Sequence, residues 1–315
     1  MNQENIPDMM VVNAGSFRDP VNRVYEVSPP GEKSRKRILR GVNQGALEAY
    51  QELANQNFYK RLVERGHVVK TSIAPNDDPD ASAIIAQGWS GVLEHETVPF
   101  VSYPYEWTFS MLRDAAMLHL HIIEKSIENG WTLKDATPYN IQFVGPRAVF
   151  IDIPSFEVRV KGEPWSGYRQ FSSMFLTPLL LKSHLGIDQI PILRSYLDGV
   201  PPTEAIKYFK GLSRFKKGVM SHITFPAMVE NSIAARERDD APAKKRTTKG
   251  QSNAMVLGLV QSLSRLIKSL KPDTQHTDWS DYDKTHSYES EDFVVKKTFV
   301  QKYAAHSARD HIWDI

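Results

Sequence analysis

The most regular hydrophobic pattern in the sequence runs over residues 107–129, where apolar positions recur at helical spacing. They form two stripes, one of Met111, Ala115, Leu118 and Ile122 and the other of Ala116, Leu120, Ile123 and Ile127. A helix that is apolar around much of its circumference is normally buried on most sides. The pattern therefore predicts a long buried helix, in which His119 and His121 face different sides and are interpreted as packing residues.

Before this helix, shorter apolar runs rich in β-forming residues predict strands. Residues 15–43 are typical of a β-hairpin, because two such runs flank a Pro-Pro-Gly turn. Residues 44–66 have helical spacing in two pieces, and Gly66 ends the second. Further strands are predicted at residues 68–73, 88–95 and 98–104, and a polar loop is predicted at residues 75–83.

After the long helix, two short β-type runs at residues 141–144 and 148–153 are separated by a Gly-Pro turn. Helical patterns follow at residues 157–186, with a bend at Pro178, and at residues 190–197 and 203–212. A polar stretch of low complexity then marks a boundary, and residues 254–270 form an amphipathic helical pattern. The second half of the chain is therefore predicted to be mostly helical.

Composition narrows the class of protein. The chain of 315 residues is 41% apolar, which is enough for one large core or for two lobes with an appended segment. Its 39 lysines and arginines nearly balance its 37 aspartates and glutamates, so charge alone implies neither nucleic acid nor an anionic membrane. The absence of cysteine excludes disulfides, thiolate metal sites and cysteine nucleophiles. With no signal-peptide pattern and no apolar run of membrane length, we expect a cytoplasmic protein without a membrane span.

The residues that point most directly to chemistry follow the long helix. Asp135 lies five residues before Asn140 in a loop that contains Pro138, and Asp152 ends the second β-type run. The short hairpin between Asn140 and Asp152 would bring these two side chains together. Carboxylate and amide oxygens suit Mg²⁺, and a further carboxylate can accept a proton. The same residue types also cap turns and end strands, so a structural role for all three stays open.

Residues 131–156 resemble the catalytic and metal-binding segments of the protein-kinase-like phosphotransferases, in the style of the aminoglycoside and lipopolysaccharide kinases. The resemblance implies an α+β, bilobal protein-kinase-like fold. We expect an antiparallel-sheet N-lobe over residues 1–105 and a helical C-lobe over residues 106–233.

The resemblance also implies ATP and Mg²⁺ as cofactors. Asp135 would be the catalytic base, and Asn140 and Asp152 would be the metal ligands. Lys134 would contact the transferred phosphate, or it is a solvated lysine. The chain departs from the protein-kinase pattern in having Leu133 in place of the usual histidine and an Ile-Pro sequence after the second aspartate.

For the nucleotide, the resemblance implies contacts from the N-lobe. Gly15 and Ser16 would lie near the turn that covers the phosphates, and Arg40 would be the phosphate-binding cation, although the chain lacks a GxGxxG loop. Arg40 is alternatively part of the solvated face of a strand. The backbone from Ser102 to Tyr105, at the expected junction of the lobes, would bind adenine. A carboxylate that holds the cation would come from the following helical region, where glutamates occur at positions 52 and 64.

The C-terminal part carries a second resemblance, to the lead-in of a class I S-adenosylmethionine-dependent methyltransferase domain. It is carried by Trp279, Tyr282, Ser287 and Tyr288, followed by a helix and a final strand at residues 311–315. Proteins related to nodulation-type methyltransferases resemble this chain in having a kinase-like region ahead of that domain. We therefore expect a polar linker over residues 234–252 and, over residues 253–315, the first helix and strand of a truncated Rossmann-like methyltransferase domain.

The expected cofactor turn of such a domain is rich in glycine, and the chain ends before it. We therefore expect S-adenosylmethionine only if a missing C-terminal domain is present. Taken together, the patterns predict a kinase-like domain that transfers phosphate from ATP to a hydroxyl of a small metabolite or sugar. It would be part of a phosphotransferase–methyltransferase protein, with a methyltransferase domain or chain as partner and no nucleic acid. A non-catalytic pseudokinase module and an N-terminal fragment of a methyltransferase stay open as alternatives.

Overall fold

A computed structural model describes residues 10–13, 16, 20–28, 36–238, 251–273 and 289–305. The chain forms two compact units, Met1–Asp273 and Thr274–Ile315. Within the described residues, no helix combines the length and the apolar character needed to cross a membrane.

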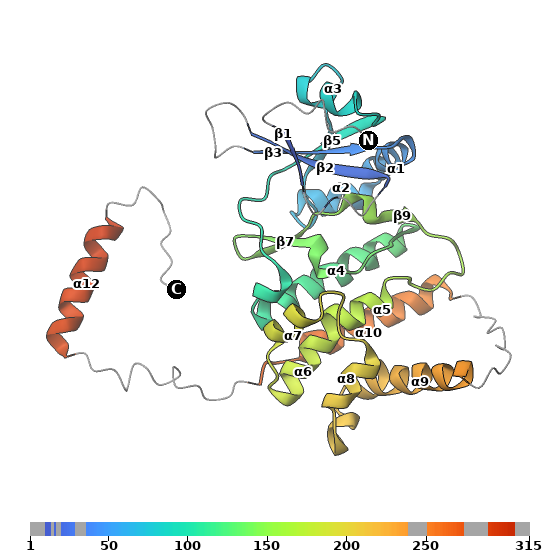
Figure 1. The fold of residues 1–315 in the computed structure, drawn as a ribbon, viewed down its shortest axis with the longest axis vertical. Helices are drawn as coiled ribbons and strands as arrows, with labels where there is room; N and C mark the ends of the chain where they lie inside the picture. Colours follow the sequence, from blue (N-terminus) through green and yellow to red (C-terminus); the bar gives the residue numbers. More distant parts are fainter. Residues whose placement is uncertain are drawn as a thin grey trace. The chain divides into compact units, whose positions relative to one another are not determined.

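The first unit begins with an antiparallel sheet, which lies at the top of Figure 1. Its five strands follow the order β1-β2-β3-β5-β4. The strands are β1 (Met10–Val12), β2 (Asn22–Val27), β3 (Arg37–Val42), β4 (Thr71–Ile73) and β5 (Gly91–His95). β2 and β3 pair along their whole length, which confirms the predicted hairpin. Residues 98–104 do not form the predicted strand, because prolines at positions 99 and 104 remove N–H groups that a ladder needs.

The outer face of the sheet is covered by α3 (Pro79–Ile85), a helix within the segment that was predicted to be a polar loop. Asp78 caps it, since its carboxylate accepts hydrogen bonds from the N–H groups of Asp80 and Ala81, both at 3.0 Å. The polar residues that suggested a loop are therefore the N-cap and first turn of a short helix.

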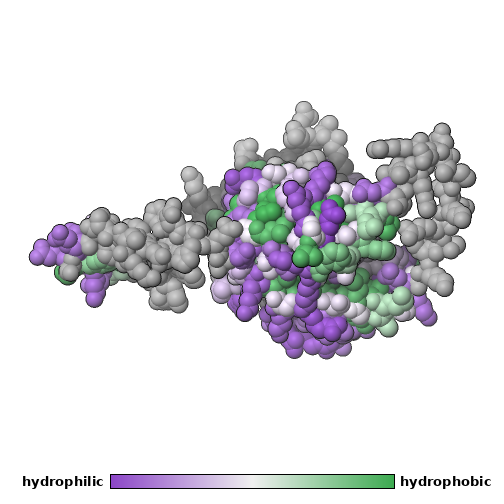
Figure 2. Space-filling model, turned by 90° about the horizontal axis from the view of Figure 1, so that it is seen from below, coloured by the Kyte–Doolittle hydropathy of each residue, from purple (hydrophilic) through white to green (hydrophobic). Residues whose placement is uncertain are grey.

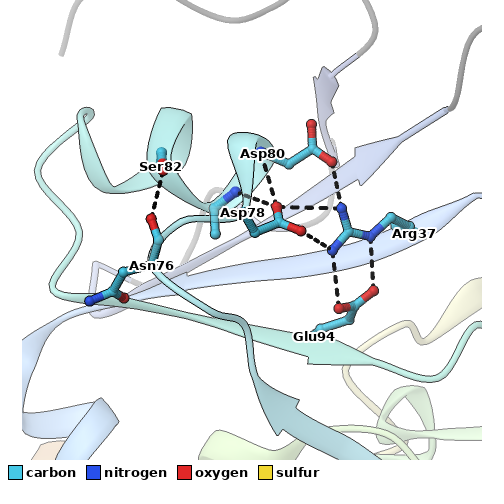
Figure 3. A network of polar contacts seen from close by, with 7 residues as sticks. Arg37, Asn76, Asp78, Asp80, Ser82 and Glu94 are labelled. Carbon is cyan, nitrogen blue, oxygen red and sulfur yellow. Dashed lines mark hydrogen bonds and ion pairs between the residues drawn. The ribbon is translucent and has the colours of Figure 1, made fainter.

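An ionic network ties α3 to the sheet (Figure 3). Arg37 on β3 contacts Asp78 at 2.9 Å, Asp80 at 2.6 Å and Glu94 of β5 at 2.9 Å. Beneath the network, the outer face of the sheet packs against α3 through buried apolar side chains, among them Tyr25, Leu39, Ile84 and Val92.

Two helices follow β3, as the spacing predicts. α1 (Gln44–Asn55) begins after Asn43, whose side chain accepts from the N–H of Ala46 at 2.9 Å, and α2 (Asn57–Glu64) follows after one intervening residue. Their buried residues, with Val42 and Leu93 of the sheet, join one large core that continues into the helical part of the unit. The inner face of the sheet and the helices therefore form a single packed body.

The helical part is organised around α4 (Phe109–Glu128), the predicted long buried helix (Figure 1). α10 (Asn253–Ser269) packs along α4 and buries Val256, Val260, Leu263, Leu266 and Ile267. The sequence pattern predicts that this helix belongs with the C-terminal segment. The structure instead places it in the first unit, because α4 covers its apolar stripe.

The remaining helices of this unit are α5 (Tyr168–Phe171), α6 (Thr177–Leu185), α7 (Gln189–Ser195), α8 (Pro202–Tyr208) and α9 (Phe225–Arg238), with π-helical turns at Ser172–Leu176 and Met220–Thr224. α9 extends to Arg238, beyond the predicted start of the linker. Figure 2 shows the protein from below, from the end at which α8 and α9 lie in Figure 1. On this face, hydrophobic residues lie among hydrophilic ones.

Two small antiparallel pairs lie between α4 and α5 in the sequence and carry the predicted chemical segment. β6 (Trp131–Leu133) pairs with β9 (Phe156–Val158), and β7 (Ile141–Val144) pairs with β8 (Arg147–Phe150). The second pair confirms the predicted short hairpin. The chain is thus a mixed α+β protein with a small antiparallel sheet and many helices, which is compatible with a kinase-like fold.

The second unit contains α12 (Ser290–Ala304) within its described residues, 289–305. Its apolar side chains, including Phe293, Val295 and Phe299, are exposed. The predicted strand at residues 311–315 and the residues at positions 279, 282, 287 and 288 lie outside the described residues.

Candidate functional site

The inner face of the large sheet carries Arg40, at the centre of β3, and this side chain reaches Asp152. The Arg40 Nη1 atom lies 3.1 Å from Asp152 Oδ1, and the two side chains are 12% and 24% exposed. The same Nη1 donates to Asn22 Oδ1 at 3.0 Å, and Nε donates to His95 Nε2 at 3.2 Å. Residues 112 positions apart in the sequence therefore meet in a partly buried ion pair.

His95 is a neutral partner of this guanidinium. Burial, and then the nearby charge of Arg40, lower the pKa of His95 to about 3. Its Nδ1 atom lies 2.9 Å from the Thr71 hydroxyl, which leaves Nε2 to accept from Arg40. Asp152 is thus the carboxylate that pairs with Arg40 among the described residues.

Asn140 completes the group. It ends the short 3₁₀ turn η3 (Pro138–Asn140), and its Nδ2 atom lies 3.4 Å from Asp152 Oδ2. The β7–β8 hairpin holds the two residues together, since Ile141 pairs with Phe150 and the Ile151 N–H donates to the Asn140 carbonyl at 2.9 Å. The structure therefore brings together Arg40, Asn140 and Asp152.

Asp135 and Lys134 are fixed to the segment that follows Asp152. The N–H of Lys134 donates to the Ser155 carbonyl at 3.0 Å, and the N–H of Asp135 donates to the Ser155 hydroxyl at 3.3 Å. Ser155 in turn donates its N–H to the Asp152 carbonyl at 3.2 Å. The loop before η3 and the segment after β8 are thus locked to each other through one serine.

Next to this region lies a cavity of about 360 Å³ between α1, the sheet and the β6–β9 pair. Lys134 is among its lining residues, together with Glu52, Glu157, and apolar side chains that include Leu53, Leu93, Trp131, Ile153 and Phe156. Burial raises the pKa of Glu157, the Lys134 ammonium lowers it, and the Glu163 and Asp135 carboxylates raise it. Lys134 is therefore close enough to Glu157 to influence its charge.

The carboxylate expected to hold Arg40 does not come from α1 or α2. Glu52 and Glu64 are exposed, and Arg40 contacts Asn22, His95 and Asp152. Among the described residues there is also no cluster of three or more acidic, histidine or cysteine side chains placed to hold a metal ion. Mg²⁺ commonly takes one or two protein oxygens and completes its shell with water and phosphate, so Asp152 and Asn140 fit such an ion.

The segment between the sheet and α4 holds the residues predicted to bind adenine. The N–H of Ser102 donates to Gln142 Oε1 at 2.9 Å, and its C=O accepts from Gln142 Nε2 at 3.1 Å. The Tyr105 ring stacks on Tyr103 at 5.4 Å between centroids. Ser16 accepts a hydrogen bond from the N–H of Val24 at 2.7 Å, and the glycine at position 15 lies outside the described residues.

Sequence reasoning missed Asn22, His95 and Gln142. Asn22 and His95 lie on β2 and β5, on the same face of the sheet as Arg40, and strand alternation could have indicated them as polar residues at inward positions. Gln142 lies in an apolar run, where a buried amide indicates a specific partner.

No protein-family model matches the chain. Nodulation protein NoeA of Rhizobium meliloti (strain 1021) is 31% identical over 295 residues, which cover 93% of this chain. The chain spans 59% of the length of that relative. Among solved structures, the Cydia pomonella Granulovirus kinase PK-1 is similar with a TM-score of 0.34 and 9% identity, over 50% of this chain and 58% of that one.

Proposed function

We propose that the chain is a kinase-like phosphotransferase domain that binds ATP with Mg²⁺ and transfers phosphate to a hydroxyl of a small metabolite or sugar. The observation that carries the proposal is the convergence of Arg40, Asn140 and Asp152 from three separate segments. A guanidinium beside a carboxylate and an amide is suited to holding a triphosphate with its metal.

Each group would have a distinct task. Asp152 and the amide oxygen of Asn140 would hold Mg²⁺, which supplies positive charge to the phosphates when bound. Arg40 would bind phosphate oxygens through its planar array of donors. Its two neutral partners, Asn22 and His95, orient the guanidinium without cancelling its charge.

Asp135 would orient the acceptor hydroxyl and take its proton, as a carboxylate can within hydrogen-bonding distance of the substrate. Lys134 would contribute positive charge beside it. Association with a methyltransferase domain or chain, which would bind S-adenosylmethionine, is part of the same proposal and is supported by the C-terminal resemblance to such domains.

The test is nucleotide binding with and without Mg²⁺, measured calorimetrically for the natural chain and for Asp152→Asn. We expect the substitution to weaken Mg²⁺–ATP binding about tenfold or more, equivalent to about 1.4 kcal/mol, because an ionised ligand is lost. Asp114→Asn is the matched control, since Asp114 is an aspartate on α4 whose side chain is 53% exposed. Nucleotide binding that depends neither on Mg²⁺ nor on the Asp152 substitution would support a non-catalytic module instead.

Turnover tests the chemistry separately from binding. Asp135→Asn should reduce phosphate transfer to a panel of sugars and polyols by about a hundredfold or more, the usual contribution of a general base. Its Mg²⁺–ATP affinity should stay close to that of the natural chain. Equal transfer rates for the two proteins would remove Asp135 from the mechanism.

A further inference from the structure

In the segment that joins the sheet to the helices, the backbone N–H groups of Ser102 and Tyr103 are engaged within the chain. Ser102 and Gln142, 8% and 5% exposed, exchange two hydrogen bonds through the Ser102 N–H and C=O. The next N–H, of Tyr103, donates to the Glu106 carboxylate at 2.7 Å, and Pro104 has no N–H. Between residues 102 and 104, every backbone N–H that exists is therefore already bonded to a side chain.

The groups that Gln142 uses are those of a nucleobase edge. A carboxamide presents an acceptor oxygen and a donor N–H side by side in one plane. Adenine presents the same pair, with N1 as acceptor and its 6-amino group as donor. At Ser102, Gln142 thus makes the two hydrogen bonds through which a backbone N–H and C=O would recognise adenine.

Several contacts hold Gln142 in this position. It lies in β7 opposite Val149, so its backbone is fixed by the hairpin. The neighbouring Phe143 ring packs edge-on against Trp107, 5.1 Å between centroids, and the Trp107 indole N–H donates to the Ser102 hydroxyl at 2.9 Å. Moving Gln142 aside would leave its own buried amide without these partners, which is unfavourable in an apolar setting.

We propose that Gln142 occupies the base-recognition position at Ser102 from within the chain, so that the nucleotide is selected by its phosphates and metal and not by the amino edge of its base. This inference rests on the proposed function, because it specifies which part of a nucleotide the site recognises. The substrate class is therefore nucleoside triphosphates with Mg²⁺, without discrimination at the 6-position of the purine.

The experiment compares ATP with purine riboside triphosphate, which is identical except that it lacks the 6-amino group. For the natural chain, the two dissociation constants should agree within about twofold, because no protein group pairs with the amino group. Gln142→Ala frees the N–H and C=O of Ser102, so ATP should then bind about fivefold to tenfold more tightly than the analogue. Gln189→Ala is the control, since Gln189 is another buried glutamine that bonds a backbone carbonyl, that of Trp107 at 3.0 Å.

Hydrogen exchange of the Ser102 amide gives a readout that needs no nucleotide. It should be slow in the natural chain and in Gln189→Ala, and fast in Gln142→Ala. A natural chain that prefers ATP by tenfold or more, or a rapidly exchanging Ser102 amide, would overturn the inference while leaving the phosphotransferase proposal intact. Failure of both triphosphates to bind would overturn that proposal and this inference with it, even with a protected amide.

Discussion

His119 should make the fold sensitive to acid. The side chain is completely buried on α4, and its ring lies among aromatic rings, with the centroid of Phe171 at 5.8 Å and that of Phe175 at 6.0 Å. Burial lowers the pKa of His119 from 6.5 to about 3. Because the folded pKa lies below the unfolded value, the stabilising effect is complete above the unfolded pKa and is lost as the pH falls toward the folded one.

The size of the effect follows from linkage. Between pH 7.5 and pH 5, the unfolded chain takes up a proton at this histidine and the folded chain does not. With the pKa of His119 at 6.5 unfolded and about 3 folded, the free energy of unfolding falls by about 2 kcal/mol over this interval. That is a large fraction of the stability of an ordinary domain.

The measurement is urea unfolding at both pH values for the natural chain and for His119→Phe, which keeps an aromatic ring in the cage and removes the titration. The natural chain should lose about 2 kcal/mol more than the variant between pH 7.5 and pH 5. His95, whose pKa burial also lowers to about 3, is present in both proteins, so its effect cancels in the comparison. Identical pH dependence in the two proteins would refute the reasoning.

Two further predictions concern the fold. Arg37→Met should lower the free energy of unfolding by about 1–2 kcal/mol, because three carboxylates lose their shared cation; urea unfolding in high salt should show a smaller loss. Gly199→Ala should destabilise by about 2 kcal/mol or more, since φ is +86° and a Cβ would meet the Ser173 carbonyl carbon at 2.8 Å. Gly88→Ala is its control, with φ of +99° and no atom within 4 Å of the added Cβ, and should cost only about 1 kcal/mol by thermal unfolding.

Elements with a long local pattern were predictable from the sequence. α4 and the β2–β3 hairpin were expected where they occur, because periodicity and turn residues act over short distances. α3 was missed because a helix of seven residues has too few turns to show periodicity, and its capping residues are also loop residues. The packing of α10 against α4 was not predicted. An amphipathic pattern shows that one face of a helix is buried, but it does not show which element covers that face.

The residues of the candidate site likewise divide into those that the sequence indicated and those that it did not. The sequence indicated Arg40, Asn140 and Asp152 by residue type and by neighbouring elements, and only the ion pair of Arg40 with Asp152 and the pairing of β7 with β8 show that they meet. Gln142 and His95 were missed because their roles depend on partners 40 and 55 residues away. Short-range rules do not reach such contacts.

The partners of Arg40 determine how a metal ion and phosphate would affect each other's binding at the proposed site. Asn22 and neutral His95 leave the guanidinium charge intact, and among the described residues Asp152 is its carboxylate partner. A metal ion held by Asp152 would compete with Arg40 for the same carboxylate, and phosphate oxygens would then be the partner of the guanidinium. Metal and phosphate should therefore bind with positive coupling. Arg40→Gln should make the Mg²⁺ dependence of ATP affinity shallower, because the phosphates lose the partner that metal binding sets free.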